Sequence, residues 1–128
     1  MEATKILMID DEKSFCQLVK MNLEMTGRFR VYVANDGKEG LKAVKKIKPD
    51  LILLDVVMPK MEGVEVLEAL KKNERFLAIP IIMLSARTDD ATKIKTSSLY
   101  ADRYVTKPVS AEALIEKIDE ILNIGKKP

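Results

Sequence analysis

The sequence predicts an α/β fold in which a doubly wound sheet of five parallel strands is flanked by five helices. Five short apolar runs alternate with longer segments whose apolar residues recur at helical spacing. Three of the runs are continuously apolar, as in central strands that helices cover on both faces. The chain has 128 residues, the size of one domain with one core.

The five predicted strands each end in polar residues. They cover residues 5–9, 31–34, 51–54, 80–84 and 103–106. The residues that follow them are Asp10 and Asp11, Asn35 and Asp36, Asp55, Ser85, and Lys107.

The five predicted helices lie between and after these runs. Their apolar positions are Phe15, Leu18, Val19 and Leu23; Leu41, Val44 and Ile47; Val64, Leu67 and Leu70; Ala91, Ile94 and Leu99; and Leu114, Ile118, Ile121 and Leu122. The segment from Thr88 to Leu99 has the weakest periodicity, although Thr88 and the two following aspartates suit a helix start. Ser110 supplies the same capping chemistry for the last helix.

Composition excludes several kinds of chemistry. The net charge is +2 with both signs interspersed, so we expect no nucleic-acid binding by this domain. Histidine is absent, which removes triad catalysis and histidine-ligated zinc, and the lone Cys16 is expected to be a packed core residue. No apolar stretch is long enough to span a membrane, so we expect a cytoplasmic protein. Residues 1–124 are expected to form the domain, and residues 125–128 a polar tail or the start of a linker.

The polar strand ends point to one site. In an open parallel sheet, ligands bind beyond the carboxyl ends of the strands. If the strand order is 2-1-3-4-5, Asp10, Asp11 and Asp55 meet at one edge of the sheet. Because close carboxylates repel, a cation belongs there, and an oxygen-only ligand set favours Mg²⁺. With the Lys107 charge and the Ser85 hydroxyl, this set suits phosphoryl transfer.

Each of these residues also has an ordinary structural interpretation. Asp11 could cap the helix that follows it, and Asp55 could close a turn. Ser85 could be a cap, and Lys107 a solvated surface charge. Their common placement at successive strand ends favours the functional interpretation.

Four motifs in order resemble the receiver domain of two-component response regulators over nearly the whole chain. They are the acidic run from Ile9 to Glu12, the turn from Leu54 to Gly63 around Asp55, the Leu84-Ser85-Ala86 step, and the segment from Tyr104 to Pro108. The resemblance implies a CheY-like, flavodoxin-like fold with strand order 2-1-3-4-5.

The resemblance also implies a role for each site residue. Asp55 would take a phosphoryl group from a phosphohistidine on a partner histidine kinase or phosphotransfer protein. Asp10, Asp11, Asp55 and the backbone carbonyl of Val57 would hold Mg²⁺. Lys107 would contact a phosphoryl oxygen, while Ser85 and Tyr104 would form the switch.

Signalling would run through the surface formed by the fourth helix, the fifth strand and the fifth helix. A downstream protein or a missing output domain would dock there, and a homodimer through the same surface stays open. Tyr100 and Gly40 depart from the usual glycine and alanine, and the Gly40 change would weaken its helix by ~1 kcal/mol if exposed. By the same resemblance, Val57 and Arg87 occupy the two variable positions that in this family tune access of water to the phosphoryl group.

Two alternatives remain at this point. One is a pseudo-receiver that acts as an interaction scaffold without phosphorylation. The other is a small Mg²⁺-dependent phosphohydrolase with an aspartate nucleophile, although such enzymes usually carry a second aspartate where this chain has Val57. The favoured interpretation is a phosphoacceptor signalling module that assists its own phosphorylation and dephosphorylation, and not a conventional enzyme.

Overall fold

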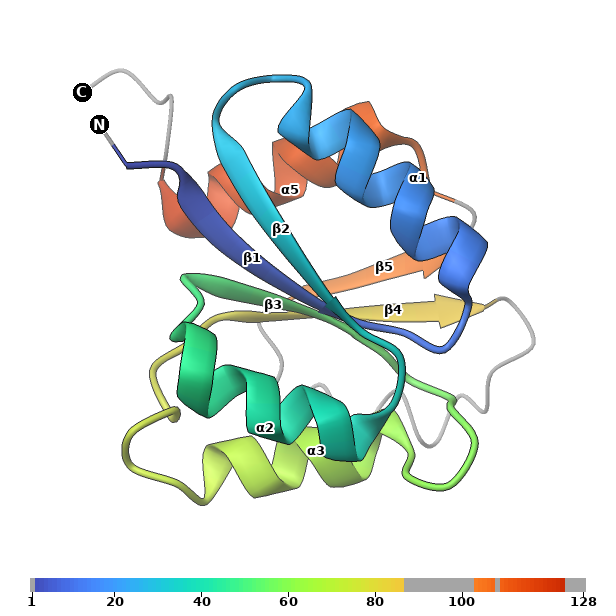
Figure 1. Ribbon diagram of the computed structural model, residues 1–128, viewed down its shortest axis with the longest axis vertical. Helices are drawn as coiled ribbons and strands as arrows, with labels where there is room; N and C mark the ends of the chain where they lie inside the picture. Colours follow the sequence, from blue (N-terminus) through green and yellow to red (C-terminus); the bar gives the residue numbers. More distant parts are fainter. Residues whose placement is uncertain (1, 87–102, 108, 124–128) are drawn as a thin grey trace.

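One parallel sheet forms the middle layer of the protein in a computed structural model (Figure 1). The structure describes residues 2–86, 103–107 and 109–123. Its strands are β1 (Thr4–Ile9), β2 (Phe29–Ala34), β3 (Leu51–Asp55), β4 (Ile81–Ala86) and β5 (Arg103–Lys107). They pair in the order β2-β1-β3-β4-β5, which confirms the predicted topology.

Helices cover both faces of the sheet. They are α1 (Lys13–Glu24), α2 (Gly37–Ile47), α3 (Gly63–Lys71) and α5 (Ala111–Leu122). In Figure 1, α1 and α5 lie on one face, and α2 and α3 on the other. The described residues thus contain four helices where five were expected, because the helix predicted from Thr88 to Leu99 lies outside them, as do Arg87 and Tyr100. None of the described helices has the length and apolar character needed to cross a membrane.

The core has two halves because successive strand residues point to opposite faces. On β1, Leu7 and Ile9 pack with residues of α2 and α3, while Ile6 and Met8 pack with residues of α1 and α5. Both β1 and β3 contain continuously apolar, fully buried residues, as expected of central strands.

Strand register positions the site. Ile9 of β1 pairs with Leu54 of β3, so Asp10 and Asp55 follow at the same sheet edge. Asp55 pairs with Leu84, the residue before Ser85, and Ala86 pairs with Lys107.

The start of α1 excludes the interpretation of Asp11 as the cap of this helix. The N-cap residue is Glu12 and not Asp11, and its side chain makes no capping hydrogen bond. Ser110, by contrast, accepts a hydrogen bond from the Ala113 N–H at 3.1 Å, as predicted for an N-cap.

Gly40 is buried, so the weakening expected of an exposed glycine in this helix does not apply. A β-carbon there would lie 2.6 Å from Cδ1 of Ile9. Glycine therefore lets α2 approach β1 closely, behind the end of the strand that leads to Asp10.

Candidate functional site

The three predicted aspartates converge at the carboxyl edge of the sheet. One carboxylate oxygen from each of Asp10, Asp11 and Asp55 lies within 4.8 Å of the others. Asp10 is fully buried, Asp55 is 5% exposed and Asp11 is exposed. The cluster therefore has a buried base and one side open to solvent.

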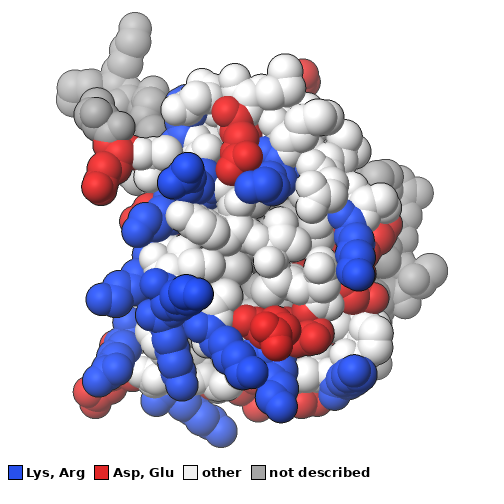
Figure 2. All heavy atoms as spheres, viewed as in Figure 1, with Lys and Arg blue, Asp and Glu red and all other residues white. Residues whose placement is uncertain are grey.

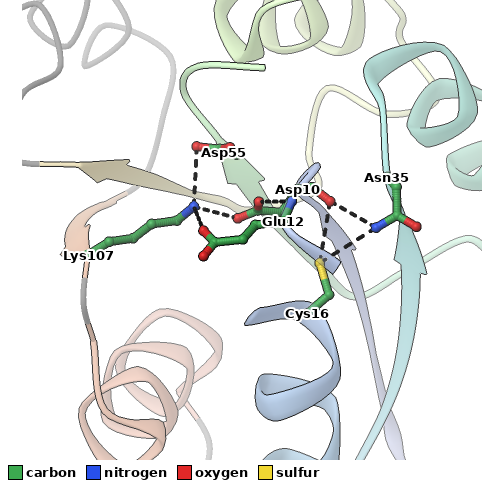
Figure 3. A network of polar contacts seen from close by, with 6 residues as sticks. All are labelled: Asp10, Glu12, Cys16, Asn35, Asp55 and Lys107. Atoms are coloured by element: carbon green, nitrogen blue, oxygen red, sulfur yellow. Dashed lines mark hydrogen bonds and ion pairs between the residues drawn. The ribbon is translucent and has the colours of Figure 1, made fainter. Parts of the chain in front are cut away.

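The Lys107 side chain extends from the end of β5 toward Asp10 and Asp55 (Figure 3). Its Nζ atom lies 2.7 Å from Asp10 Oδ2, 3.6 Å from Asp55 Oδ1 and 3.7 Å from Glu12 Oε1. The same atom lies 4.8 Å from the ring centre of Phe15, in cation–π range. Burial alone would lower the pKa of Lys107, but the contact with Asp10 and the charges of Asp10, Asp55 and Glu12 raise it. The lysine is thus a fixed positive charge at this edge.

Asp10 is held by backbone and side-chain contacts. Its Oδ1 accepts a hydrogen bond from the Glu12 N–H at 2.9 Å. Its carbonyl oxygen accepts hydrogen bonds from Asn35 Nδ2 at 3.0 Å and from the Cys16 thiol at 3.4 Å (Figure 3). Burial raises the pKa of Cys16 to about 12, so the thiol stays protonated and can donate.

The burial of Asp55 and its charged neighbours set its pKa. Burial is the main cause that raises its pKa to about 7, and the negative charge of Asp10 adds to this effect. The Lys107 charge and a hydrogen bond from the Val57 backbone act in the opposite direction. Burial and the Asp10 charge outweigh the lysine, so the site as described favours a further cation.

The donor set fits Mg²⁺. Asp10 Oδ2 is buried and, among the described residues, accepts no hydrogen bond of ordinary geometry, although Lys107 Nζ is nearby. This buried carboxylate oxygen, which is paired with the Lys107 ammonium, and the two neighbouring carboxylates supply hard oxygen ligands, and the described part of the chain brings no histidine or thiolate to compete.

The other predicted residues lie near this edge. Ser85 is 4% exposed and follows Leu84, the strand partner of Asp55. Tyr104 is half-buried on β5 and packs against the core half that contains α2 and α3. The Val57 side chain is 43% exposed, two residues beyond Asp55.

Comparison with known protein families assigns the chain to one of them. The profile of the family described as response regulator receiver domain matches residues 6–119. The chain belongs to this family. Its buried aspartates form an acidic pocket of the kind at which receiver domains bind Mg²⁺.

Two curated relatives of this receiver domain are transcriptional regulators. The alkaline phosphatase synthesis transcriptional regulatory protein PhoP of Bacillus subtilis is 42% identical over 118 residues, which cover 92% of this chain and 48% of that protein. The DNA-binding dual master transcriptional regulator RpaA of Synechocystis is 38% identical over 118 residues, with the same coverage. The chain thus spans about half the length of these relatives.

Solved receiver structures share the fold. A CheY-like receiver domain protein from Methanospirillum hungatei is 32% identical, with a TM-score of 0.87 and 95% of each chain covered. The Vibrio cholerae chemotaxis protein CheY4 is 30% identical, with a TM-score of 0.85, and the match covers 94% of this chain and 99% of that one.

Sequence reasoning missed four residues of this receiver site. Glu12 and Phe15 contact Lys107, while Cys16 and Asn35 hold the Asp10 carbonyl. Adjacency to the acidic pair was the available signal for Glu12. Placement at the end of the second predicted strand was the signal for Asn35. The contacts of Phe15 and Cys16 depend on how α1 packs against β1, and no local pattern indicates them.

Proposed function

We propose that Asp55 accepts a phosphoryl group from a phosphohistidine on a histidine kinase or phosphotransfer protein. In this step the N–P bond of the donor breaks, an O–P bond to an Asp55 oxygen forms, and the histidine nitrogen regains a proton. The observation that carries the proposal is the convergence of Asp55 with Asp10, Asp11 and Lys107. An attacking carboxylate needs its neighbours' charges neutralised and the incoming phosphoryl oxygens stabilised, and positioned charges supply both.

Asp10, Asp11, Asp55 and the Val57 carbonyl are the groups we propose to hold Mg²⁺. The ion would neutralise carboxylate charge and phosphoryl charge together. Glu12 and Asn35 keep Asp10 in place through the hydrogen bonds described above. Lys107 then shifts from its contact with Asp10 toward a phosphoryl oxygen, a role that its long side chain permits.

Ser85 and Tyr104 are the residues we propose to transmit phosphorylation. Ser85 would donate a hydrogen bond to a phosphoryl oxygen, and Tyr104 would turn inward in response. Tyr104 is suited to this role because it is half-buried on β5, beside β4. The resulting change would reach the surface of β5 and α5, where an output domain or a downstream protein docks. The helix predicted as the third part of that surface lies outside the described residues.

The exposed face of α1 is where we propose that the phosphodonor protein docks. Leu18, Met21 and Met25 are each more than half exposed and lie along one side of this helix. Phe15 of the same helix contacts Lys107, so a protein seated on this face borders the phosphoacceptor. Met21→Glu should slow transfer from a protein donor and leave modification by acetyl phosphate unchanged, as measured by mass spectrometry.

Intact mass spectrometry after incubation with acetyl phosphate tests the phosphoacceptor. We expect one Mg²⁺-dependent, hydroxylamine-labile phosphate on the wild type and none on Asp55→Asn. Unmodified, folded wild-type protein, under conditions that modify a control receiver, would contradict the proposal and favour an interaction scaffold.

A further inference from the structure

A basic hollow lies at the end of the molecule opposite the phosphoacceptor. It has a volume of about 520 Å³ and is lined by Lys45, Lys48, Pro49, Arg75, Phe76 and Ile79. Figure 2 shows lysine and arginine side chains gathered at the lower left of the face in view, over the ends of α2 and α3. We call this feature the α2–α3 hollow.

The charges at the rim of the α2–α3 hollow have no acidic partner among the residues that the structure describes. Lys45, Lys48 and Arg75 are exposed, and no carboxylate in the described part of the chain forms an ion pair with any of them. The nearby acidic Asp50 instead accepts a hydrogen bond from the Lys5 backbone. Lys45, in the last turn of α2, and Lys48, its C-cap residue, offset the helix dipole, whereas Arg75 lies four residues beyond the end of α3.

The floor of the hollow is apolar and fixed. Phe76 is 8% exposed and, with Ile79, packs against the core half that contains α2 and α3. Leu77, between them on the same loop, is 51% exposed. An apolar side chain from a partner would therefore meet a preformed apolar surface ringed by positive charge.

Lys48 stands where another residue would favour stability. It caps α2 in the left-handed conformation, with φ of 54°, a conformation that glycine adopts without steric cost. A lysine in this conformation costs stability, and at the rim of the hollow it adds a charge that forms no ion pair within the described ranges. Both features are expected if the charge is used for binding.

We propose that the α2–α3 hollow binds an acidic peptide segment of another protein, with one apolar side chain seated on Phe76 and Ile79. Complementary charge would come from carboxylates that flank this side chain and face Lys45, Lys48 and Arg75. An acidic peptide can supply both carboxylates for this charge and an apolar side chain for the apolar floor, whereas the phosphate backbone of a nucleic acid would engage the charge alone.

The hollow is separate from the phosphorylation site. Pro49 and Ile79 come shortly before β3 and β4, whereas Asp55 and Ser85 lie at the carboxyl ends of these strands. Binding at the hollow is therefore a tethering interaction that does not need Asp55, and its test is independent of the proposed phosphoacceptor function.

The test uses a labelled nonapeptide of Glu and Asp residues with a central Leu. Its binding to the ¹⁵N-labelled chain is followed by chemical-shift changes and fluorescence anisotropy. We expect shifts around Lys45, Lys48, Arg75 and Phe76, with affinity falling when the central Leu is replaced by Ser. Lys48→Glu should weaken binding about fivefold, whereas Lys13→Ala, which removes an exposed charge on α1, should not.

Lys48→Gly tests whether the weaker binding of Lys48→Glu could come from a damaged fold. This variant should raise the thermal midpoint and still weaken peptide binding, while Asp55→Asn should leave binding unchanged. Three results would overturn the proposal. They are an affinity that does not change when the central Leu is replaced, an affinity that falls as much in Lys13→Ala as in Lys48→Glu, and no chemical-shift change around the hollow. Tighter binding of a decamer of thymidylate would assign the hollow to nucleic acid, and concentration-dependent dimers lost in Lys48→Glu would assign it to a second copy.

Discussion

A β-carbon on Gly63 would lie 2.0 Å from the carbonyl oxygen of Asp55. A hydrogen bond from the Gly63 N–H to the Val56 carbonyl, at 2.9 Å, closes the loop between β3 and α3. Because Val56 directly follows Asp55, this bond brings Gly63 close to Asp55. Backbone, and not a flexible side chain, occupies the space that a side chain at position 63 would need. The absence of a side chain at the first helical residue of α3 therefore lets the loop pass close to the backbone of the proposed phosphoacceptor.

Gly63→Ala should both destabilise the fold and impair phosphorylation. We expect a loss of about 1–3 kcal/mol in the free energy of unfolding, because the loop must move away from Asp55. The rate of modification by acetyl phosphate should fall with it. Urea unfolding and intact mass provide the two measurements.

Gly27→Ala is the matched control for this change. Gly27 has φ of 78° and open space around it, so alanine there costs about 1–2 kcal/mol through backbone conformation alone. Its phosphorylation rate should stay at the wild-type value. An equal loss of rate in both variants would attribute the Gly63 effect to stability and not to the position of Asp55.

Lys107→Met should make the fold more dependent on Mg²⁺. Removal of the ammonium leaves the Asp10 and Asp55 carboxylates without their shared counterion, so we expect a loss of about 1–3 kcal/mol in chelator. Mg²⁺ should restore more stability to this variant than to the wild type, as measured by urea unfolding. Lys42→Met, at an exposed lysine with a 3.9 Å contact to Glu39, should show neither effect. A variant that stays unfolded in Mg²⁺ would give Lys107 a structural role.

Stability in chelator should depend on the protonation of Asp55. Burial raises the pKa of Asp55 from 3.8 to about 7 in the folded state, so the folded chain holds this proton more tightly than the unfolded chain. Asp55 therefore destabilises the fold progressively as pH rises from about 4 to about 7. The stability of Asp55→Asn relative to wild type should increase across this range in urea titrations. A pH-independent difference between the two proteins would contradict the assignment, and added Mg²⁺ should reduce the difference at pH 8.

The Lys20–Glu24 pair should protect the β2 edge of the sheet. Val31 of β2 donates its N–H to Glu24 Oε2 at 2.9 Å, and its carbonyl accepts from Lys20 Nζ at 2.7 Å. Since β2 is an outer strand, the pair occupies backbone groups that could otherwise recruit another strand. The double variant Lys20→Ala, Glu24→Ala should self-associate in sedimentation velocity. Glu39→Ala, Lys42→Ala removes an ion pair of the same type from α2 and should stay at the wild-type oligomeric state.

Acid should weaken the same protection. The hydrogen bond from the Val31 backbone lowers the pKa of Glu24 below 4.5 despite some desolvation. Its contribution is therefore complete above the unfolded-state pKa and is lost as pH falls through the lower folded-state value. Self-association of the wild type that is the same on both sides of this range would argue against Glu24 as the protecting group.

Local patterns in the sequence predicted a parallel α/β sheet and the main site residues, and the resemblance of its motifs to receiver domains predicted the strand order 2-1-3-4-5. Apolar runs that alternate with helical segments indicate parallel strands. A polar residue follows each run, and the carboxyl ends of parallel strands meet at one edge of the sheet. Asp10, Asp55, Ser85 and Lys107 were found in this way. The roles of Asp55, Lys107, Ser85, Tyr104 and the Val57 carbonyl in phosphoryl transfer stay predictions.

Only the tertiary structure decided the features that depend on how elements pack. The contact between Lys107 and Phe15, the close approach of Gly40 to Ile9 and the raised pKa of Asp55 all require the distance between separate elements. The α2–α3 hollow likewise joins residues from the end of α2, from the segment that follows it and from the loop between α3 and β4. Sequence periodicity determines which side of a helix faces the sheet, but the depth and angle at which that helix packs are set by the complete core.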